Sequence, residues 1–103
     1  MASGLQAAND LAANTLTTLY TVPSAKTLSF AVNFTNRNEN PVVVSLAIAA
    51  ASTPSVAEYI LYQFVIEGNN HFERSGLVAQ AGKLIVAQSA FANVSAQVYG
   101  YEA

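Results

Sequence analysis

Large apolar side chains alternate with small or polar ones between Leu28 and Thr35, and the apolar positions are Leu28, Phe30, Val32 and Phe34. Successive side chains of a β-strand point to opposite faces, so this period of two predicts a half-buried strand over residues 28–35. A shorter apolar stretch at 16–22 predicts a strand before it. Pro23-Ser24-Ala25-Lys26 separates the two strands. Because proline fixes its own φ and donates no backbone hydrogen bond, this segment predicts a corner, either a hairpin or a crossing between sheets.

Five further stretches of strand length follow, separated by short segments rich in Asn, Gly, Ser and Pro. They predict strands over residues 42–49, 59–66, 71–75, 83–88 and 94–101. Glu67-Gly68-Asn69-Asn70 is typical of a hairpin turn, so we expect strand 71–75 to run back beside strand 59–66. The glycines at 76 and 82 predict a bend before strand 83–88. Strand 42–49 is apolar at both its odd-numbered and its even-numbered positions, which favours a central strand or one whose outer face meets another chain.

Strands joined by short turns, with no periodic segment of helix length, predict one all-β domain over residues 15–103. We expect an antiparallel β-sandwich of about seven or eight strands, either jelly-roll or immunoglobulin-like. Residues 1–14 are rich in Ala and Asn, and after Met1 only Leu5 and Leu11 are large and apolar. Their spacing fits no clear helical stripe or strand face, so we expect an extended or partly helical N-terminal arm.

Charge is scarce in this chain. Only 10% of its 103 residues are charged, against about 25% in an average soluble domain, whereas 52% are hydrophobic. The exterior must therefore consist mainly of Ala, Ser, Thr, Asn and Gln, and such a surface resists association poorly. We expect a chain that is largely covered by partners, the alternative being a charge-poor monomer. The candidate assembly contacts are Leu5, Leu11, Val43, Pro54 and Val56.

The same composition argues against several classes of protein. The net charge is −2 and the four basic residues are scattered, so we expect no nucleic-acid partner. Cysteine is absent, which removes disulfides and thiol nucleophiles. No apolar run approaches the length that spans a bilayer, and no signal-like leader is visible, so we expect no membrane partner. We also expect no metal and no cofactor.

Residues for catalysis are sparse, and we do not expect an enzyme. His71 is the sole imidazole. Glu67 and Glu73 lie near it in sequence and could form an acid pair, but glutamates beside a turn are more often solvated charges. No Gly-x-Ser-x-Gly motif occurs. The triplets Asn33-Phe34-Thr35 and Asn93-Val94-Ser95 match the glycosylation pattern, which arises often by chance, and we discount both.

The tyrosines offer a second kind of site. Strands 59–66 and 94–101 carry four of the five tyrosines, namely Tyr59, Tyr62, Tyr99 and Tyr101. Such a set could form an aromatic ligand face that binds a sugar. The alternative is that aromatic residues are simply favoured in strands.

One segment carries a family resemblance: Leu19-Tyr20-Thr21-Val22-Pro23-Ser24-Ala25-Lys26-Thr27. It resembles small all-β virion proteins of tailed bacteriophages, notably cyanophages and other marine phages. Ser24-Ala25 stands where such proteins often have alanine-glycine. From Thr15 onward the likeness continues through Asn36-Arg37, Glu58-Tyr59-Ile60, Tyr62, Asn93-Val94-Ser95 and Tyr99-Gly100-Tyr101-Glu102.

This resemblance implies a multicopy structural protein of the virion, located on the capsid surface or the tail. Such a subunit would decorate or cement the capsid, or belong to the tail, through protein–protein contacts. The expected partners are copies of itself, as a trimer or dimer, and the major capsid or tail proteins. The alternative is a receptor- or glycan-binding module of a tail fibre.

Overall fold

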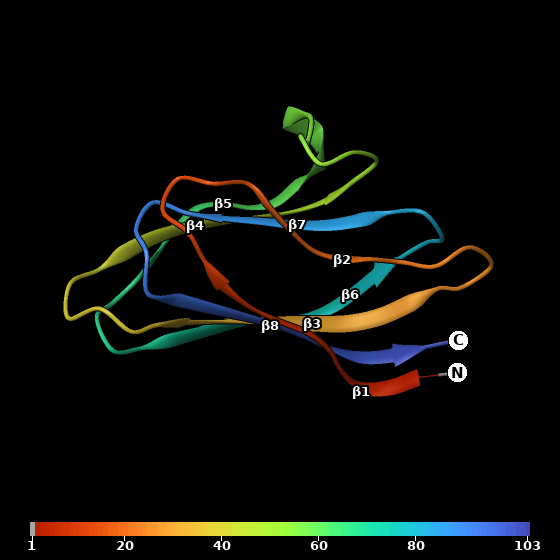
Figure 1. Cartoon of the computed structure of the whole chain (residues 1–103), viewed down its shortest axis with the longest axis horizontal. Helices are drawn as coiled ribbons and strands as arrows, with labels where there is room; N and C mark the ends of the chain where they lie inside the picture. The colour runs from red at the N-terminus through yellow and green to blue at the C-terminus, as the bar shows by residue number, and fades with distance from the viewer. Residues whose placement is uncertain (1) are drawn as a thin grey trace.

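Eight strands form two antiparallel sheets that lie face to face in the computed structural model, which describes residues 2–103 (Figure 1). The strands are β1 (Ala2–Leu11), β2 (Thr17–Thr21), β3 (Leu28–Asn36), β4 (Val42–Ala49), β5 (Tyr59–Ile66), β6 (His71–Ala79), β7 (Leu84–Ser89) and β8 (Val94–Glu102). A 3-10 helix, η1 (Val56–Glu58), precedes β5. Within residues 2–103 no helix is long and apolar enough to cross a membrane. The predicted all-β sandwich is confirmed.

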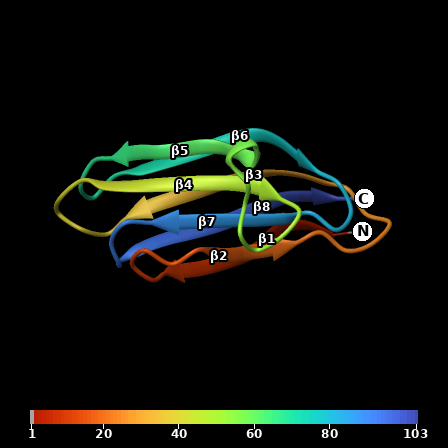
Figure 2. The same ribbon diagram turned by 90° about the horizontal axis from the view of Figure 1, so that it is seen from above.

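The strand order identifies the topology. Sheet A has the order β1-β8-β3-β6, and sheet B has the order β2-β7-β4-β5 (Figure 2). The antiparallel pairs are therefore nested along the chain: β1 with β8, β2 with β7, β3 with β6, and β4 with β5. This is the order of an eight-stranded jelly roll, which resolves the choice between jelly-roll and immunoglobulin-like sandwiches.

Two predicted turns are crossings between the sheets. The Pro23 corner leads from β2 in sheet B to β3 in sheet A, which is one of the two expected forms. The turn at 67–70 is not the predicted hairpin, because β5 lies in sheet B and β6 lies in sheet A. The rings of Phe64 in β5 and Phe72 in β6 stack with their centroids 4.2 Å apart and pack against the core. These two half-buried rings thus contact each other between the two sheets.

The segment expected as an N-terminal arm is an integral strand of sheet A. β1 pairs with β8 from Ala2 to Leu11, and the side chain of Leu11 is 1% exposed in the core. A register shift between Leu5 and Ala7 places Leu5 on the outer face and Leu11 on the inner face. Only small or polar residues lie between Leu5 and Leu11, which is why the side-chain pattern did not indicate a strand.

Similar irregularities occur in every pairing that involves an edge strand. The β1–β8, β2–β7, β3–β6 and β4–β5 pairs all contain a register shift, whereas the described central pairs β3–β8 and β4–β7 contain none. In β6 the strand passes through Gly76, at φ +73°, and continues to Ala79, so the bend predicted from residue 76 begins only after residue 79. Bulges at sheet edges hinder pairing with the strands of other molecules.

The core lies between the two sheets and is made of the inward residues of both. Its largest fully buried side chains include Phe34, Leu28, Leu46, Ile85 and Val98. The hydroxyl of Tyr20 in β2 donates a hydrogen bond to the carboxylate of Glu102 in β8, and this bond joins sheet B to sheet A.

Candidate functional site

The outer face of sheet B is the least charged surface of the molecule. None of its four strands contains a charged residue. The register aligns Thr18, Val86, Ala47 and Tyr59 in one row across this face. Ala47 and Val86 are nevertheless buried, because residues 50–58 fold back over this part of the sheet (Figures 1 and 2). Strand β4 is thus central, as one of its two interpretations required, and its outer face is partly covered by its own chain.

The carboxylate of Glu58 holds this covering loop in place. It accepts hydrogen bonds from the backbone N–H of Ser55 at 2.9 Å and of Ala50 at 3.0 Å. The bond from Ser55, and next that from Ala50, holds the pKa of Glu58 below its ordinary value. The charged side chain is therefore engaged within the loop, and the loop leaves Val56 exposed at its crest.

Two tyrosines form an aromatic pair beside this loop. The rings of Tyr59 and Tyr62 meet edge to face, with centroids 5.1 Å apart and an interplanar angle of 72°. In a regular strand, residues three apart point to opposite faces. Here two register shifts in the β4–β5 pair, and a φ of +51° at Gln63, bring the two rings together. The backbone N–H of Gln63 donates to Ser45 Oγ at 3.0 Å and fixes this bulge to β4.

The tyrosine pair separates two neighbouring hollows. One, of about 180 Å³, is lined by Asn14, Val43, Ser45, Tyr59, Tyr62, Gln63, Gln88 and Ala90. The other, of about 340 Å³, is lined by Val56, Tyr59 and Tyr62. No charged residue belongs to either lining. We call the two hollows together the tyrosine site. Sequence reasoning identified its tyrosines, Val43 and Val56, but missed its amides and Ser45.

The other two predicted tyrosines lie on the opposite side of the molecule. Tyr99 and Tyr101 belong to β8 in sheet A, so the four tyrosines do not form one ligand face. The hydroxyl of Tyr99 donates a hydrogen bond to the carboxylate of Glu73 on β6. This bond, with a smaller contribution from burial, raises the pKa of Tyr99 to about 12.

The outer face of sheet A divides into an apolar and a polar end. One row across the sheet contains Ser3, Tyr101, Ser29 and Val78, and the next contains Leu5, Tyr99 and Ala31. Asp10, Ser95, Thr35 and His71 form a row near the other end. We call the set Leu5, Ala31, Val78, Tyr99 and Tyr101 the apolar end of sheet A.

The predicted assembly contacts are scattered. Leu5 lies in the apolar end of sheet A, and Val56 is exposed in the loop over sheet B. Val43 and Pro54 are half-buried. Leu11 is buried in the core and offers no surface to a neighbour, so this part of the prediction is wrong. The bulge between Leu5 and Ala7 is the reason, because it turns Leu11 inward.

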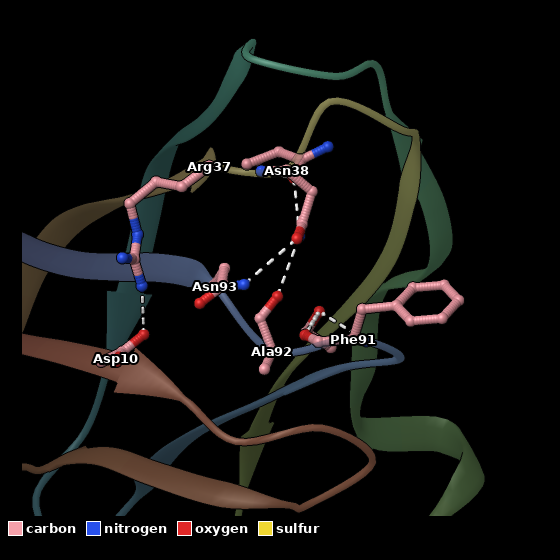
Figure 3. Close-up of polar contacts among 8 residues, drawn as sticks. Asp10, Arg37, Asn38, Phe91, Ala92 and Asn93 are labelled. Atoms are coloured by element: carbon pink, nitrogen blue, oxygen red, sulfur yellow. Dashed lines mark hydrogen bonds and ion pairs between the residues drawn. The ribbon is translucent and has the colours of Figure 1, made fainter.

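Asparagines join the turns after β3 and β7 at the end of the sandwich opposite the termini (Figure 3). The Asn38 amide donates to the carbonyl oxygen of Ala92 at 2.8 Å, and the Asn93 amide donates to Asn38 Oδ1 at 3.3 Å. Arg37 forms an ion pair with Asp10 nearby. The exposed ring of Phe91 borders a hollow of about 340 Å³, which is also lined by Asn38, Asn40, Pro41, Val42, Ala92 and Asn93. The density of Asn between residues 33 and 40 was the available signal for this cluster.

The remaining predicted polar residues are dispersed. His71 is exposed and pairs with Thr35, whereas Glu73 is engaged by Tyr99. Glu67 lies exposed in the turn before β6. Among residues 2–103 no group of three or more His, Cys, Asp or Glu could hold a metal ion. No family model, curated protein or solved structure matches the chain.

Proposed function

We propose that the chain is a multicopy structural subunit of a tailed-bacteriophage virion, acting through protein–protein contacts on the capsid surface or the tail. The observation that carries the proposal is the apolar end of sheet A. Leu5, Val78 and Tyr101 are 60%, 59% and 44% exposed, and they lie on the outer face of one sheet. Apolar side chains gathered on one face favour contact with protein.

The partner that best fits this surface is a second copy of the chain. The bulges along all four edge strands disfavour association by strand addition, so copies have their outer faces available for contact. Asp10 and His71 lie in the row near the other end of this face. Glu73 borders the apolar end, but its carboxylate is engaged by the hydroxyl of Tyr99. Two copies can therefore meet there without burying an unpaired charge.

The jelly roll agrees with this proposal as an analogy. This topology recurs in viral capsid and lectin domains, among others. A fold alone does not determine function, so the weight of the proposal rests on the surface and on the likeness of residues 19–27 to phage virion proteins.

Sedimentation equilibrium of the purified chain tests self-association. We expect a dimer or trimer, and we expect Leu5→Glu or Val78→Lys to shift it toward monomer, because each places a charge within the contact. Ala8→Glu is the matched control, since Ala8 is also exposed on β1 but lies toward the polar end. A wild-type chain that stays monomeric at high concentration would overturn the proposed self-contact.

The virion itself provides the second test. We expect the chain among the proteins of purified particles, in many copies, and a low-resolution map should place it on the capsid or the tail. Its absence from intact particles that are made by the phage encoding it would contradict the structural role.

A further inference from the structure

We propose that the tyrosine site on the outer face of sheet B binds an uncharged carbohydrate. This inference goes beyond a structural role and does not depend on self-association, because the site and the apolar end of sheet A lie on opposite sheets. It begins from the aromatic pair. Tyr62 is 66% exposed, and its ring stands nearly perpendicular to that of Tyr59.

The chemistry of the rings fits a sugar. A pyranose presents C–H groups on its faces and hydroxyls around its rim. A tyrosine ring offers an apolar surface that can contact the C–H groups, and its phenolic hydroxyl can hydrogen-bond with the sugar hydroxyls. Two rings at 72° form a corner that can contact a sugar face with one ring and its rim with the other.

Free hydrogen-bonding groups surround this corner. The side-chain amides of Asn14, Gln63 and Gln88 line the smaller hollow, and they form no hydrogen bond with other described residues. The hydroxyls of Tyr59 and Tyr62 are likewise unengaged within residues 2–103. Amides both donate and accept hydrogen bonds, as sugar hydroxyls do. The site therefore combines apolar surface with unpaired polar groups that can match a saccharide.

The absence of charge from the linings narrows the class of sugar. An anionic ligand would call for a basic residue, and neither hollow is lined by one. Glu58 is the charged residue next to Tyr59 in the chain, but its carboxylate is engaged by Ser55 and Ala50 within the loop. A neutral hexose or N-acetylhexosamine unit matches this lining.

The site is also organised before any ligand arrives. The bulge at Gln63 is tied to Ser45, and the loop that carries Val56 is tied by Glu58. Little conformational entropy must therefore be lost on binding. The hollow at the asparagine turns is a weaker candidate, because the side-chain amides of Asn38 and Asn93 already donate hydrogen bonds to Ala92 and Asn38, respectively.

A titration of the isotopically labelled full chain with neutral oligosaccharides tests the proposal. The probes are oligomers of glucose, mannose, galactose and N-acetylglucosamine. With at least one of them we expect saturable shifts in the backbone amide resonances of Tyr59, Tyr62, Gln63 and Gln88. If no neutral sugar produces such shifts, the proposal is overturned.

Three variants locate the binding. Tyr62→Ala should weaken the affinity by about tenfold or more, because it removes the exposed ring. Tyr62→Phe should weaken it less, because the ring remains. Phe91→Ala, which truncates an exposed aromatic ring outside both hollows of the tyrosine site, is the matched control and should not change the affinity. The site assignment fails if Phe91→Ala weakens binding as much as Tyr62→Ala. It also fails if resonances of the site shift with protein concentration alone, since a second copy would then occupy it.

Discussion

Asn36 is the residue that joins the turns at one end of the sandwich. Its side chain is 1% exposed and makes five hydrogen bonds. The amide nitrogen donates to the carbonyl oxygens of Asn40, Ile66 and Glu67 at 2.9, 3.1 and 3.1 Å. The amide oxygen accepts from the backbone and side chain of Asn38 at 2.9 and 3.1 Å. One side chain thus connects the turn after β3 to the turn after β5.

Asn36→Ala should lower the free energy of unfolding by about 3 kcal/mol, because it removes the donor of one buried and two partly buried carbonyl groups. Urea denaturation measures the change. Asn40→Ala is the control: its side chain is exposed and forms no hydrogen bond with other described residues, so we expect a change of about 0.5 kcal/mol or less. Equal stabilities of the two variants would contradict the role given to Asn36.

Tyr20 and Glu102 connect the two sheets at the other end of the molecule. Their hydrogen bond, followed by burial, raises the pKa of Tyr20 to about 12 from an ordinary value of 10.0. A raised pKa means that the contribution to stability is fully present below about pH 10. It is lost as the pH rises through about 12.

Tyr20→Phe should therefore destabilise the protein by about 2 kcal/mol at neutral pH, since the buried carboxylate of Glu102 loses its donor. The variant should also lose the part of the alkaline decline in stability that Tyr20 causes. Denaturation curves at several pH values measure both effects. Glu102→Gln keeps an acceptor for the Tyr20 hydroxyl and should be the milder change. If Tyr20→Phe is as stable as the wild type, the bond does not contribute.

At the scale of elements, the turn after β5 packs directly against the turn after β3. A Cβ added at Gly68 would lie 1.9 Å from the backbone oxygen of Glu39. Gly68→Ala must therefore push the two turns apart, and we expect a loss of at least about 2 kcal/mol in thermal or urea denaturation. Gly82→Ala is the graded comparison. It has open space but a φ of +81°, so it should cost about 1 kcal/mol. The reverse order would contradict the packing of these turns.

The loop of residues 50–58 should loosen in acid. A lowered pKa at Glu58 means that its contribution is present above the ordinary value of 4.5 and is lost as the pH falls through the folded-state pKa. Hydrogen exchange at the amides of Ala50 and Ser55, expressed as protection factors, should show protection near neutral pH and its loss in acid. Glu58→Gln should remove most of this pH dependence. Protection that persists unchanged in acid would contradict the anchoring role.

Seven of the eight strands could be predicted from the sequence, because their apolar residues follow a period of two or form short continuous runs. β3 is the clearest case: the alternation from Leu28 to Thr35 marks the strand to within one residue of its end at Asn36. β1 could not be recognised, because only small or polar residues lie between Leu5 and Leu11. The bulge that places these two leucines on opposite faces leaves no mark in the sequence. The place of β1 in the sheet comes from backbone pairing with β8, which side-chain periodicity does not reveal.

The tyrosine site could be predicted only in part for the same reason. Tyr59 and Tyr62 were identifiable as aromatic residues, but their spacing of three gave no sign that they share a face. The register shifts beside Gln63 decide this, and they arise from pairing with β4. Strand pairing also places Tyr99 and Tyr101 in sheet A, whereas Tyr59 and Tyr62 lie in sheet B. Pairing between distant segments is the information that local patterns lack.

At the scale of the whole molecule, at least half of the ten charged side chains are engaged in local contacts. Glu102 lies under Tyr20, Glu58 holds the loop, Glu73 accepts from Tyr99, and Asp10 pairs with Arg37. Because only 10% of the residues are charged, repulsion between copies is weak. The bulged edge strands hinder association by strand addition. Contacts between molecules should therefore involve apolar and neutral polar faces.

This distribution predicts how self-association responds to salt. Raising NaCl from about 0.05 M to about 0.5 M screens interactions between charges, and an apolar contact should change its association constant by less than about threefold. Ammonium sulfate should strengthen the same contact, because excluded salts favour the burial of apolar surface. Sedimentation equilibrium in the two salts measures both responses, and the Leu5→Glu variant serves as the control with a weakened contact. A large loss of association in NaCl would mean that ion pairs hold the copies together, and the apolar end of sheet A would not be their contact.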